Sequence, residues 1–341
     1  MAGLVGIWRA GAVAVLSNVE QPANRLRQVA DSADYVLTKP TLASTVWAEQ
    51  RGRIVVPDGT SPLHDDLGSS QGGRPSSACV LHTSGTSGMP KPVVLEHRGL
   101  AHRISRLQAL YEITSTDKIA QLAAPSVDVV LWETLLACVS GAQLEIPTGL
   151  SRTPGPDLAQ WLFQRDITVM TCTPTMLAAL PETVLPAIRL IVLGGEHCDP
   201  TRHAFWIQHH QVANAYGPTE ATIETHVCSR VSLERPAPIG RPVDGVEDFL
   251  LDDHHLPVPD GRVGELYLCG VGLAARYDGL PEATAVAFRP LILDGELRRV
   301  YRTGDLACRR PDGQLVFVGR ADRQLNLGGF RLEPAEVEQA A

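Results

Sequence analysis

The stretch LHTSGTSGMPKPVVLEHR, residues 81–98, places four hydroxyl side chains, two glycines and a lysine between two apolar runs. The runs ACVLHT before it and PVVLEH after its lysine have the composition of short strands, so the stretch is predicted to be a loop that joins two strands. Glycines let a backbone approach a ligand closely. Successive backbone N–H groups with hydroxyl donors form a cavity for anions, and a lysine adds a mobile positive charge. These features favour a polyphosphate ligand.

The loop is not a Walker A motif. That motif has its lysine followed by Ser or Thr at the start of a helix. Here Lys91 lies between Pro90 and Pro92, and the element that follows is a predicted strand. Taken alone, the stretch is equally compatible with a Ser/Gly-rich surface loop, so the rest of the chain decides.

Composition excludes several classes of function. The 341 residues carry a net charge of −8 and are 44% hydrophobic, which is ordinary for a globular protein and unlike a nucleic-acid-binding surface. No run approaches the roughly 18 apolar residues of a membrane span. The seven cysteines form no C-x-x-C pair. We therefore expect a cytoplasmic protein without nucleic-acid or membrane partners, disulfide framework or zinc site.

The pattern along the chain predicts an α/β fold. An apolar face recurs at helical spacing after the loop, and β-rich runs alternate with helical stretches up to about residue 235. Beyond that point short strands dominate, and LACRR and QLVFVGR flank a PDG turn as a hairpin would. We expect an α/β core over residues 1–235 and a smaller β-rich, barrel-like subdomain over 236–320. The helical face consists of Leu100, Ile104, Leu107 and Tyr111.

Several further blocks follow the opening loop in a fixed order. Together they resemble the signature motifs of adenylate-forming enzymes, and most closely those of the amino-acid adenylation domain of nonribosomal peptide synthetases. The resemblance covers essentially the whole chain. The blocks are IVLGGE at 191–196, NAYGPTE at 214–220, GELYLCGVGLAARYDG at 264–279, YRTGDL at 301–306 and GRADRQLNLGGFRLEPAEVE at 319–338.

The resemblance implies the large N-terminal body of the adenylate-forming fold, with layered α/β subdomains. It implies activation of an amino acid by ATP and Mg²⁺ as aminoacyl-AMP, then transfer to the phosphopantetheine thiol of a peptidyl carrier protein. Such enzymes serve secondary metabolism, including antibiotic biosynthesis. The resemblance leaves open whether an MbtH-like accessory protein takes part.

The same resemblance assigns nucleotide-binding residues. The loop would grip the β and γ phosphates, Tyr216 would stack on adenine, Asn214 would read its amino edge, and Asp305 with Arg320 would bind ribose. Thr219 would contact the α-phosphate and Glu220 would hold Mg²⁺, so Thr219, Glu220 and Lys91 are the predicted catalytic residues. The remaining nucleotide-binding predictions are Thr83, Ser84, Gly85, Thr86, Ser87, Gly88, Gly194, Gly195 and Gly217.

For the amino acid, Asp128 matches the carboxylate that pairs with the substrate's α-ammonium. The resemblance places mostly apolar residues around the side chain, with Glu224 as the exception. Glu224 could accept an indole N–H, pair with a basic side chain, or point to solvent, and the sequence leaves these alternatives open. The other predicted pocket residues are Val129, Trp132, Thr171, Ile191, Leu193, Ala215 and Ile223.

The chain departs from the family pattern in several places. Pro92, Asn326 and Gly328 replace a glycine and two positively charged residues that are usual there. Residues 321–341 match a hinge and the start of a C-terminal lobe, so we expect a body truncated at both ends. The family's catalytic lysine lies in that lobe, and no lysine follows Lys118. An acyl- or aryl-CoA ligase relative and a non-catalytic remnant are the alternative functions.

Overall fold

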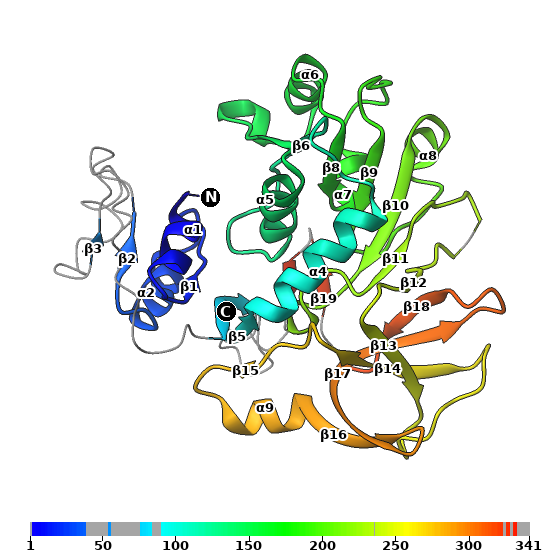
Figure 1. Ribbon diagram of the computed structural model, residues 1–341. Helices are drawn as coiled ribbons and strands as arrows, with labels where there is room; N and C mark the ends of the chain where they lie inside the picture. Colours follow the sequence, from blue (N-terminus) through cyan, green and yellow to red (C-terminus); the bar gives the residue numbers. More distant parts are fainter. Residues whose placement is uncertain are drawn as a thin grey trace.

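The computed structural model describes residues 2–38, 54–55, 76–83, 90–234 and 236–322, with the backbone alone at 54–55, 325–327 and 330–332. It is a layered α/β body with a β-rich part at one side (Figure 1). The predicted fold class is confirmed. The predicted loop residues Ser84–Gly88 and most of the expected start of the C-terminal lobe lie outside the described residues.

A seven-stranded sheet forms the centre of the body, in the order β12-β11-β10-β9-β8-β6-β7. The strands from β10 to β7 run parallel, while β11 and β12 are antiparallel additions at one edge. Parallel strands are covered on both faces, which explains why every residue of LIVL and VMTC is buried, without alternation. The strand bounds are β6 (Lys118–Ala120), β7 (Gln143–Glu145), β8 (Val169–Cys172), β9 (Leu190–Leu193), β10 (Gln211–Tyr216), β11 (His226–Cys228) and β12 (Arg241–Pro242).

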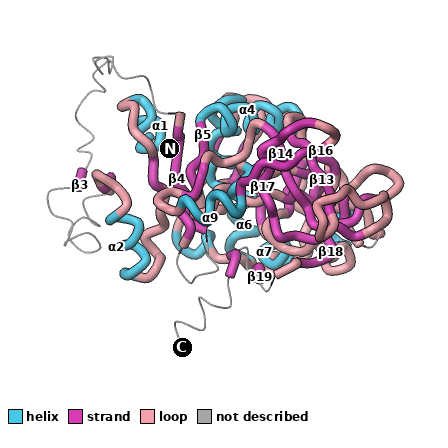
Figure 2. The backbone as a smooth tube through the Cα atoms, turned by 90° about the horizontal axis from the view of Figure 1, so that it is seen from below, coloured by secondary structure: helices cyan, strands magenta, loops and turns pink. Residues whose placement is uncertain are grey.

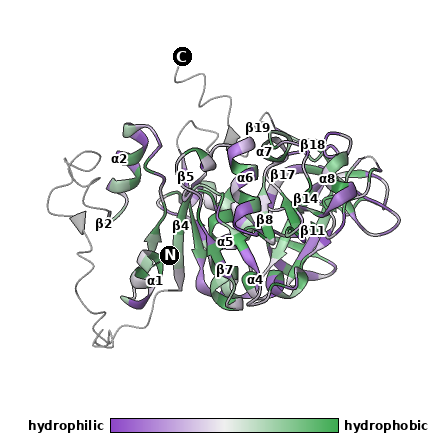
Figure 3. Cartoon of the chain, turned by 90° about the horizontal axis from the view of Figure 1, so that it is seen from above, coloured by the Kyte–Doolittle hydropathy of each residue, from purple (hydrophilic) through white to green (hydrophobic). Residues whose placement is uncertain are grey.

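Helices cover the two faces of this sheet. Helices α4 (His97–Leu110) and α5 (Val129–Ser140) pack on one face, where the predicted apolar face of α4 and Tyr111 are buried. Helices α6 (Pro156–Gln164), α7 (Pro174–Ala178) and α8 (Ala204–His209) pack on the other. Short 3₁₀ helices follow at η2 (Gly149–Arg152) and η3 (Thr219–Ala221). Hydrophobic residues accordingly gather on the strands in the middle of the molecule (Figure 3).

The strands that flank the opening loop belong to a second, four-stranded sheet. Strands β4 (Ser77–Thr83) and β5 (Lys91–Glu96) are antiparallel neighbours, so the loop joins two strands as predicted. β1 (Ala14–Val15) and β15 (Arg276–Tyr277) complete the order β1-β4-β5-β15. Helix α1 (Ala2–Arg9) is tied to it because Trp8 Nε1 donates to the Ala78 carbonyl over 2.7 Å. Helix α2 (Ala23–Asp31) and the parallel pair β2 (Val36–Leu37) and β3 (Ile54–Val55) lie beside it.

The β-rich part is a five-stranded antiparallel sheet, seen beside the α/β body in Figure 2. It contains β13 (Val246–Leu251), β14 (Val263–Gly270), β16 (Phe288–Leu293), β17 (Glu296–Arg309) and β18 (Leu315–Arg320), with α9 (Pro281–Ala287) before β16. β17 and β18 form the predicted hairpin. β19 (Leu325–Leu327) pairs with β20 (Phe330–Leu332). The division at residue 235/236 remains a prediction.

Candidate functional site

Asp128 is a buried carboxylate at the N-terminal end of α5. Its side chain is 8% exposed. Burial raises its pKa to about 6, against the opposing effect of hydrogen bonds from the Thr219 hydroxyl and the Ile223 backbone N–H. Its Oδ2 atom is buried and has no hydrogen-bond partner among the described residues. A buried polar atom without a partner is costly, so this oxygen is suited to a cationic donor from outside the protein.

The segment between β10 and β11 supplies the partners of Asp128. Gly217 lies so close to this segment that an added Cβ would stand 1.8 Å from the Ile223 carbonyl oxygen. Thr222 and Ile223 have φ values of 62° and 65°, a left-handed conformation that β-branched residues rarely adopt. The surrounding contacts must hold this strain. This backbone conformation turns the Ile223 N–H toward Asp128.

Three predicted nucleotide-binding side chains meet beside this segment. The Tyr216 hydroxyl donates to Asp305 Oδ2 over 2.5 Å, and Arg320 Nη1 donates to Asp305 Oδ1 over 2.6 Å. Asn214 is buried nearby on the same strand as Tyr216, where its side-chain amide donates to the Pro238 carbonyl over 2.8 Å. Tyr216 and Asn214 come from β10, Asp305 from β17 and Arg320 from β18, so this group joins the central sheet to the β-rich part.

Glu220 and Lys91 are connected through a residue that the sequence motifs did not single out. The Tyr277 hydroxyl donates to Glu220 Oε1 over 2.8 Å, and Lys91 Nζ lies 5.6 Å from the centre of the Tyr277 ring. Tyr277 belongs to β15, which pairs with β5 beside the opening loop. A tyrosine in the block ARYDG was the only sequence signal for it.

Most predicted side-chain pocket residues lie on the face of the central sheet that α5 covers. Trp132, Ala215 and Ile223 share one core cluster with the buried residues of α4. Thr171 faces the same way because it is two positions from Val169, which belongs to that cluster.

Ile191 and Leu193 lie on the other face of the central sheet from α5. Both belong to the cluster on the opposite face, packed under α6, α7 and α8. Successive side chains of a strand alternate between faces, so the neighbouring residue Val192 faces α5 instead. Val192 is the direct neighbour of Thr171 in the parallel register of β8 and β9. The assignment of Ile191 and Leu193 to the amino-acid pocket stays a prediction.

Glu224 does not point to solvent. It is 7% exposed, and its Oε2 atom accepts a hydrogen bond of 2.7 Å from the Tyr111 hydroxyl at the end of α4. Burial raises its pKa to about 7, while the hydrogen bond from Tyr111 and the charge of Arg103 lower it. Tyr111 also meets Trp132 edge to face, with ring centres 5.7 Å apart.

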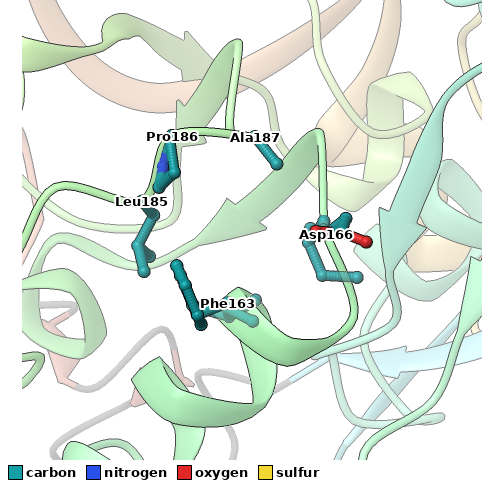
Figure 4. Close-up of a pocket in the computed structure, with 7 residues that line it drawn as sticks. Phe163, Asp166, Leu185, Pro186 and Ala187 are labelled. Atoms are coloured by element: carbon teal, nitrogen blue, oxygen red, sulfur yellow. The ribbon is translucent and has the colours of Figure 1, made fainter.

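Other features of the described residues lie away from this site. They contain no group of three or more potential metal ligands and no helix that is both long and apolar enough to cross a membrane. A small hollow between the end of α6 and the segment before β9 contains none of the predicted site residues (Figure 4). It is lined by Leu162, Phe163, Asp166, Ile167, Leu185, Pro186 and Ala187.

Comparison with known proteins agrees with this geometry. The family model described as AMP-binding enzyme matches residues 1–278. The chain is 37% identical over 348 residues to a linear gramicidin synthase of Brevibacillus parabrevis, covering 99% of the chain and 4% of that protein. It is 36% identical over 348 residues to phosphinothricin tripeptide synthetase PhsC of Streptomyces viridochromogenes, covering 97% of the chain and 31% of that protein. The chain thus spans only a small part of these relatives.

A similar solved structure is NpsA-ThdA, an artificially fused adenylation–PCP di-domain from Klebsiella oxytoca. The match has a TM-score of 0.83 and 25% sequence identity, and it covers 99% of this chain and 69% of that one. With that coverage, the similarity includes the central sheet, the helices beside it and the β-rich part alike.

Proposed function

Because the chain belongs to the family of AMP-binding enzymes, we propose that it binds ATP and an amino acid and joins them as aminoacyl-AMP, releasing pyrophosphate. The observation that carries this proposal is the buried Asp128 carboxylate, whose Oδ2 atom lacks a hydrogen-bond partner among the described residues. A fatty or aryl acid would leave that charge unpaired, whereas the α-ammonium of an amino acid supplies both a donor and an opposite charge. An acyl- or aryl-CoA ligase activity is therefore not favoured.

The nucleotide end is formed by the residues around Asp305. We propose that adenine stacks on Tyr216 beside Asn214 and that the ribose hydroxyls bind Asp305. In the ligand-free protein the Tyr216 hydroxyl and Arg320 already satisfy this carboxylate. Ribose must therefore share or replace the bond from Tyr216, while Arg320 remains the ion-pair partner of the carboxylate. Gly194 and Gly195, at the end of β9, let the backbone pass close to adenosine.

The reacting atoms meet at the segment between β10 and β11. One carboxylate oxygen of the amino acid attacks the α-phosphorus of ATP, the bond to the bridging oxygen breaks, and pyrophosphate leaves with that electron pair. Such transfers depend on positioning and on stabilising negative charge. Thr219 adjoins Asp128, so it lies where the amino acid and the α-phosphate would come together. Lys91 and the loop before it are proposed to hold the β and γ phosphates.

The Glu220 carboxylate fits a magnesium ion shared with the phosphates. Mg²⁺ commonly takes only one or two protein carboxylates and completes its coordination with phosphate oxygens and water. Glu220 is 1% exposed and is held by the Tyr277 hydroxyl. When bound, the ion would offset phosphate charge, and Tyr277 would fix the carboxylate that holds it.

We further propose that the acyl group passes to the phosphopantetheine thiol of a peptidyl carrier protein. The support is the similarity to NpsA-ThdA, which is described as an adenylation–PCP fusion. An MbtH-like accessory protein is a second candidate partner.

Binding of a stable aminoacyl-AMP mimic tests the proposal. Isothermal titration calorimetry would compare an aminoacyl-sulfamoyl adenosine with AMP and with a benzoyl-sulfamoyl adenosine. We expect the aminoacyl mimic to bind at least about tenfold more tightly than the other two, because only it places an ammonium against Asp128. An Asp128→Ala variant should lose this advantage and keep its affinity for AMP. Tighter binding of the benzoyl mimic would overturn amino-acid activation in favour of an aryl-acid ligase. Absence of binding to all three would support a non-catalytic remnant.

A further inference from the structure

We propose that Arg103 and Tyr111 of the α4 segment set the specificity of the amino-acid pocket by neutralising Glu224, so that the substrate carries an uncharged side chain. This inference rests on the proposed function, because it concerns the pocket beside Asp128. It adds two specificity-determining residues that lie in a different part of the sequence from the pocket predictions. It also decides between the alternatives that the sequence left open for Glu224.

Glu224 already has partners within the protein. Its Oε2 atom accepts the Tyr111 hydroxyl hydrogen bond of 2.7 Å. Trp132 lies close enough for its indole N–H to lower the pKa of Glu224, although Nε1 has no hydrogen bond of normal geometry. A carboxylate that the protein already holds with its own donors is poorly placed to act as the main counter-ion of a substrate.

Arg103 supplies the opposite charge from the buried face of α4. It is 1% exposed, and its Nε and Nη2 atoms donate to the carbonyls of Thr222 and Ala221 over 3.2 and 3.4 Å. Those carbonyls belong to the segment with left-handed residues that leads directly to Glu224. Arg103 therefore holds the backbone that carries Glu224, and its charge lowers the pKa of that carboxyl without a direct ion pair.

Neither protonation state of Glu224 leaves a negative charge available for a substrate side chain. If Glu224 is ionised, Arg103 offsets its charge and Asp128 is offset by the substrate's α-ammonium. If Glu224 is protonated, Arg103 remains as a buried cation. In neither state is a negative charge left over for a cationic substrate side chain, and buried charges without partners are strongly disfavoured.

With Glu224 ionised, charged side chains are therefore excluded from both directions. A lysine or ornithine side chain would meet the Arg103 charge, and a glutamate side chain would meet Glu224 and Asp128. An uncharged side chain, whether aliphatic, amide or aromatic, disturbs neither pairing. The alternative in which Glu224 pairs with a basic substrate is thereby not favoured.

The test uses four aminoacyl-sulfamoyl adenosines that differ only in the amino acid: leucine, glutamine, glutamate and lysine. Glutamine and glutamate have the same size, so their comparison isolates charge. We expect the tighter-binding uncharged mimic to exceed both charged ones in affinity by at least about tenfold in calorimetry. Preference for lysine or for glutamate, or equal binding of all four, would overturn this inference while leaving amino-acid activation intact. Binding of AMP without any aminoacyl mimic would overturn the proposed function itself.

Variants separate a charge effect from a folding effect. Glu224→Gln leaves Arg103 unbalanced and should raise the affinity for the glutamate mimic relative to glutamine by about tenfold. Arg103→Met leaves Glu224 unbalanced and should shift the preference toward lysine. Arg106→Met, at a half-exposed position on the same helix, is the matched control and should change nothing. If Arg103 had a structural role alone, Arg103→Met would weaken the binding of all four mimics equally, and that result would refute the proposal. Glu224→Gln tests the same charge balance, so the proposal stays testable even if Arg103→Met folds poorly.

Discussion

Replacing Asp128 by asparagine should stabilise the ligand-free protein while abolishing its recognition of an ammonium group. Burial raises the pKa of Asp128 from its usual 3.8 to about 6. Because the folded protein then holds the proton more tightly than the unfolded chain, stability falls as the pH rises from 3.8 to about 6 and stays low above it. One pKa unit corresponds to about 1.36 kcal/mol, so ionised Asp128 costs the fold about 3 kcal/mol near neutral pH.

Asparagine keeps the size of the side chain and removes the charge, so Asp128→Asn should recover most of this cost. For a chain of 341 residues the gain corresponds to a rise in Tm of about 4 °C at pH 7.5. The difference should shrink toward zero at pH 4, where the aspartate is protonated in the folded protein. Affinity for an aminoacyl-sulfamoyl adenosine should fall by at least about a hundredfold, since a buried ion pair is lost.

Differential scanning calorimetry between pH 4 and 8 measures the first effect, and isothermal titration calorimetry measures the second. The exposed position Asp253→Asn is the matched control and should change neither Tm nor affinity. The reasoning is refuted if Asp128→Asn melts at or below the wild-type temperature at pH 7.5, or if the difference in Tm is the same at pH 4 and pH 7.5.

Three further changes probe the nucleotide end, the segment beside Asp128 and a separate ion pair of the fold. Asp305→Asn should weaken AMP binding by about tenfold or more in calorimetry, because it removes the charge proposed to bind the ribose hydroxyls; unchanged binding would contradict that role. Gly217→Ala should lower the free energy of unfolding by at least about 3 kcal/mol in urea titration, because its Cβ would stand 1.8 Å from the Ile223 carbonyl oxygen; a loss below about 1 kcal/mol would show that this segment can shift freely. Arg189→Leu should lower the free energy of unfolding by about 3 kcal/mol, because it leaves the buried Asp117 without the 2.8 Å ion pair that helps to hold its pKa at about 2. An unchanged urea midpoint would contradict this.

Matched controls exist for the last two changes. Gly6→Ala is made in helix α1, where an added Cβ meets nothing within 4 Å, and should be tolerated. Arg276→Leu breaks an ion pair with Asp278 in which both side chains are about half exposed, and it should cost well under about 1 kcal/mol. If these controls lowered the free energy of unfolding as much as Gly217→Ala and Arg189→Leu, the structural reasoning behind those two predictions would be contradicted.

Local pattern predicted the order of elements well. The strands on either side of the opening loop, the buried face of α4 and the β17–β18 hairpin are all found where the sequence indicated them. Each depends on spacing within about a dozen residues, which the chain carries in itself. The blocks that resembled adenylate-forming enzymes also pointed to side chains that meet in space, namely Tyr216 with Asp305 and Asp128 with Thr219.

The sequence does not show which residues of β9 face α5. Ile191 and Leu193 were assigned to the pocket, but they face the opposite side of the central sheet, and Val192 takes the position facing α5. A continuous apolar strand that is buried on both faces has no alternation from which the inward positions can be read. The pairing register with the neighbouring strand decides which positions face inward, and that register cannot be read from the sequence of one strand.

The sequence by itself determined which chemistry is available: a glycine- and hydroxyl-rich loop, a carboxylate at the start of α5, and ordered blocks whose tyrosine, aspartate and arginine are proposed to form one nucleotide site. Only the tertiary structure decided the environment of those groups. It buried Asp128 with an unpaired oxygen, connected Glu220 to Lys91 through Tyr277, and placed Tyr111 and Arg103 against Glu224 and the segment before it from more than a hundred residues away. The reason is physical: the protonation and pairing of a buried group depend on what surrounds it in space, and distant segments of the chain supply those surroundings.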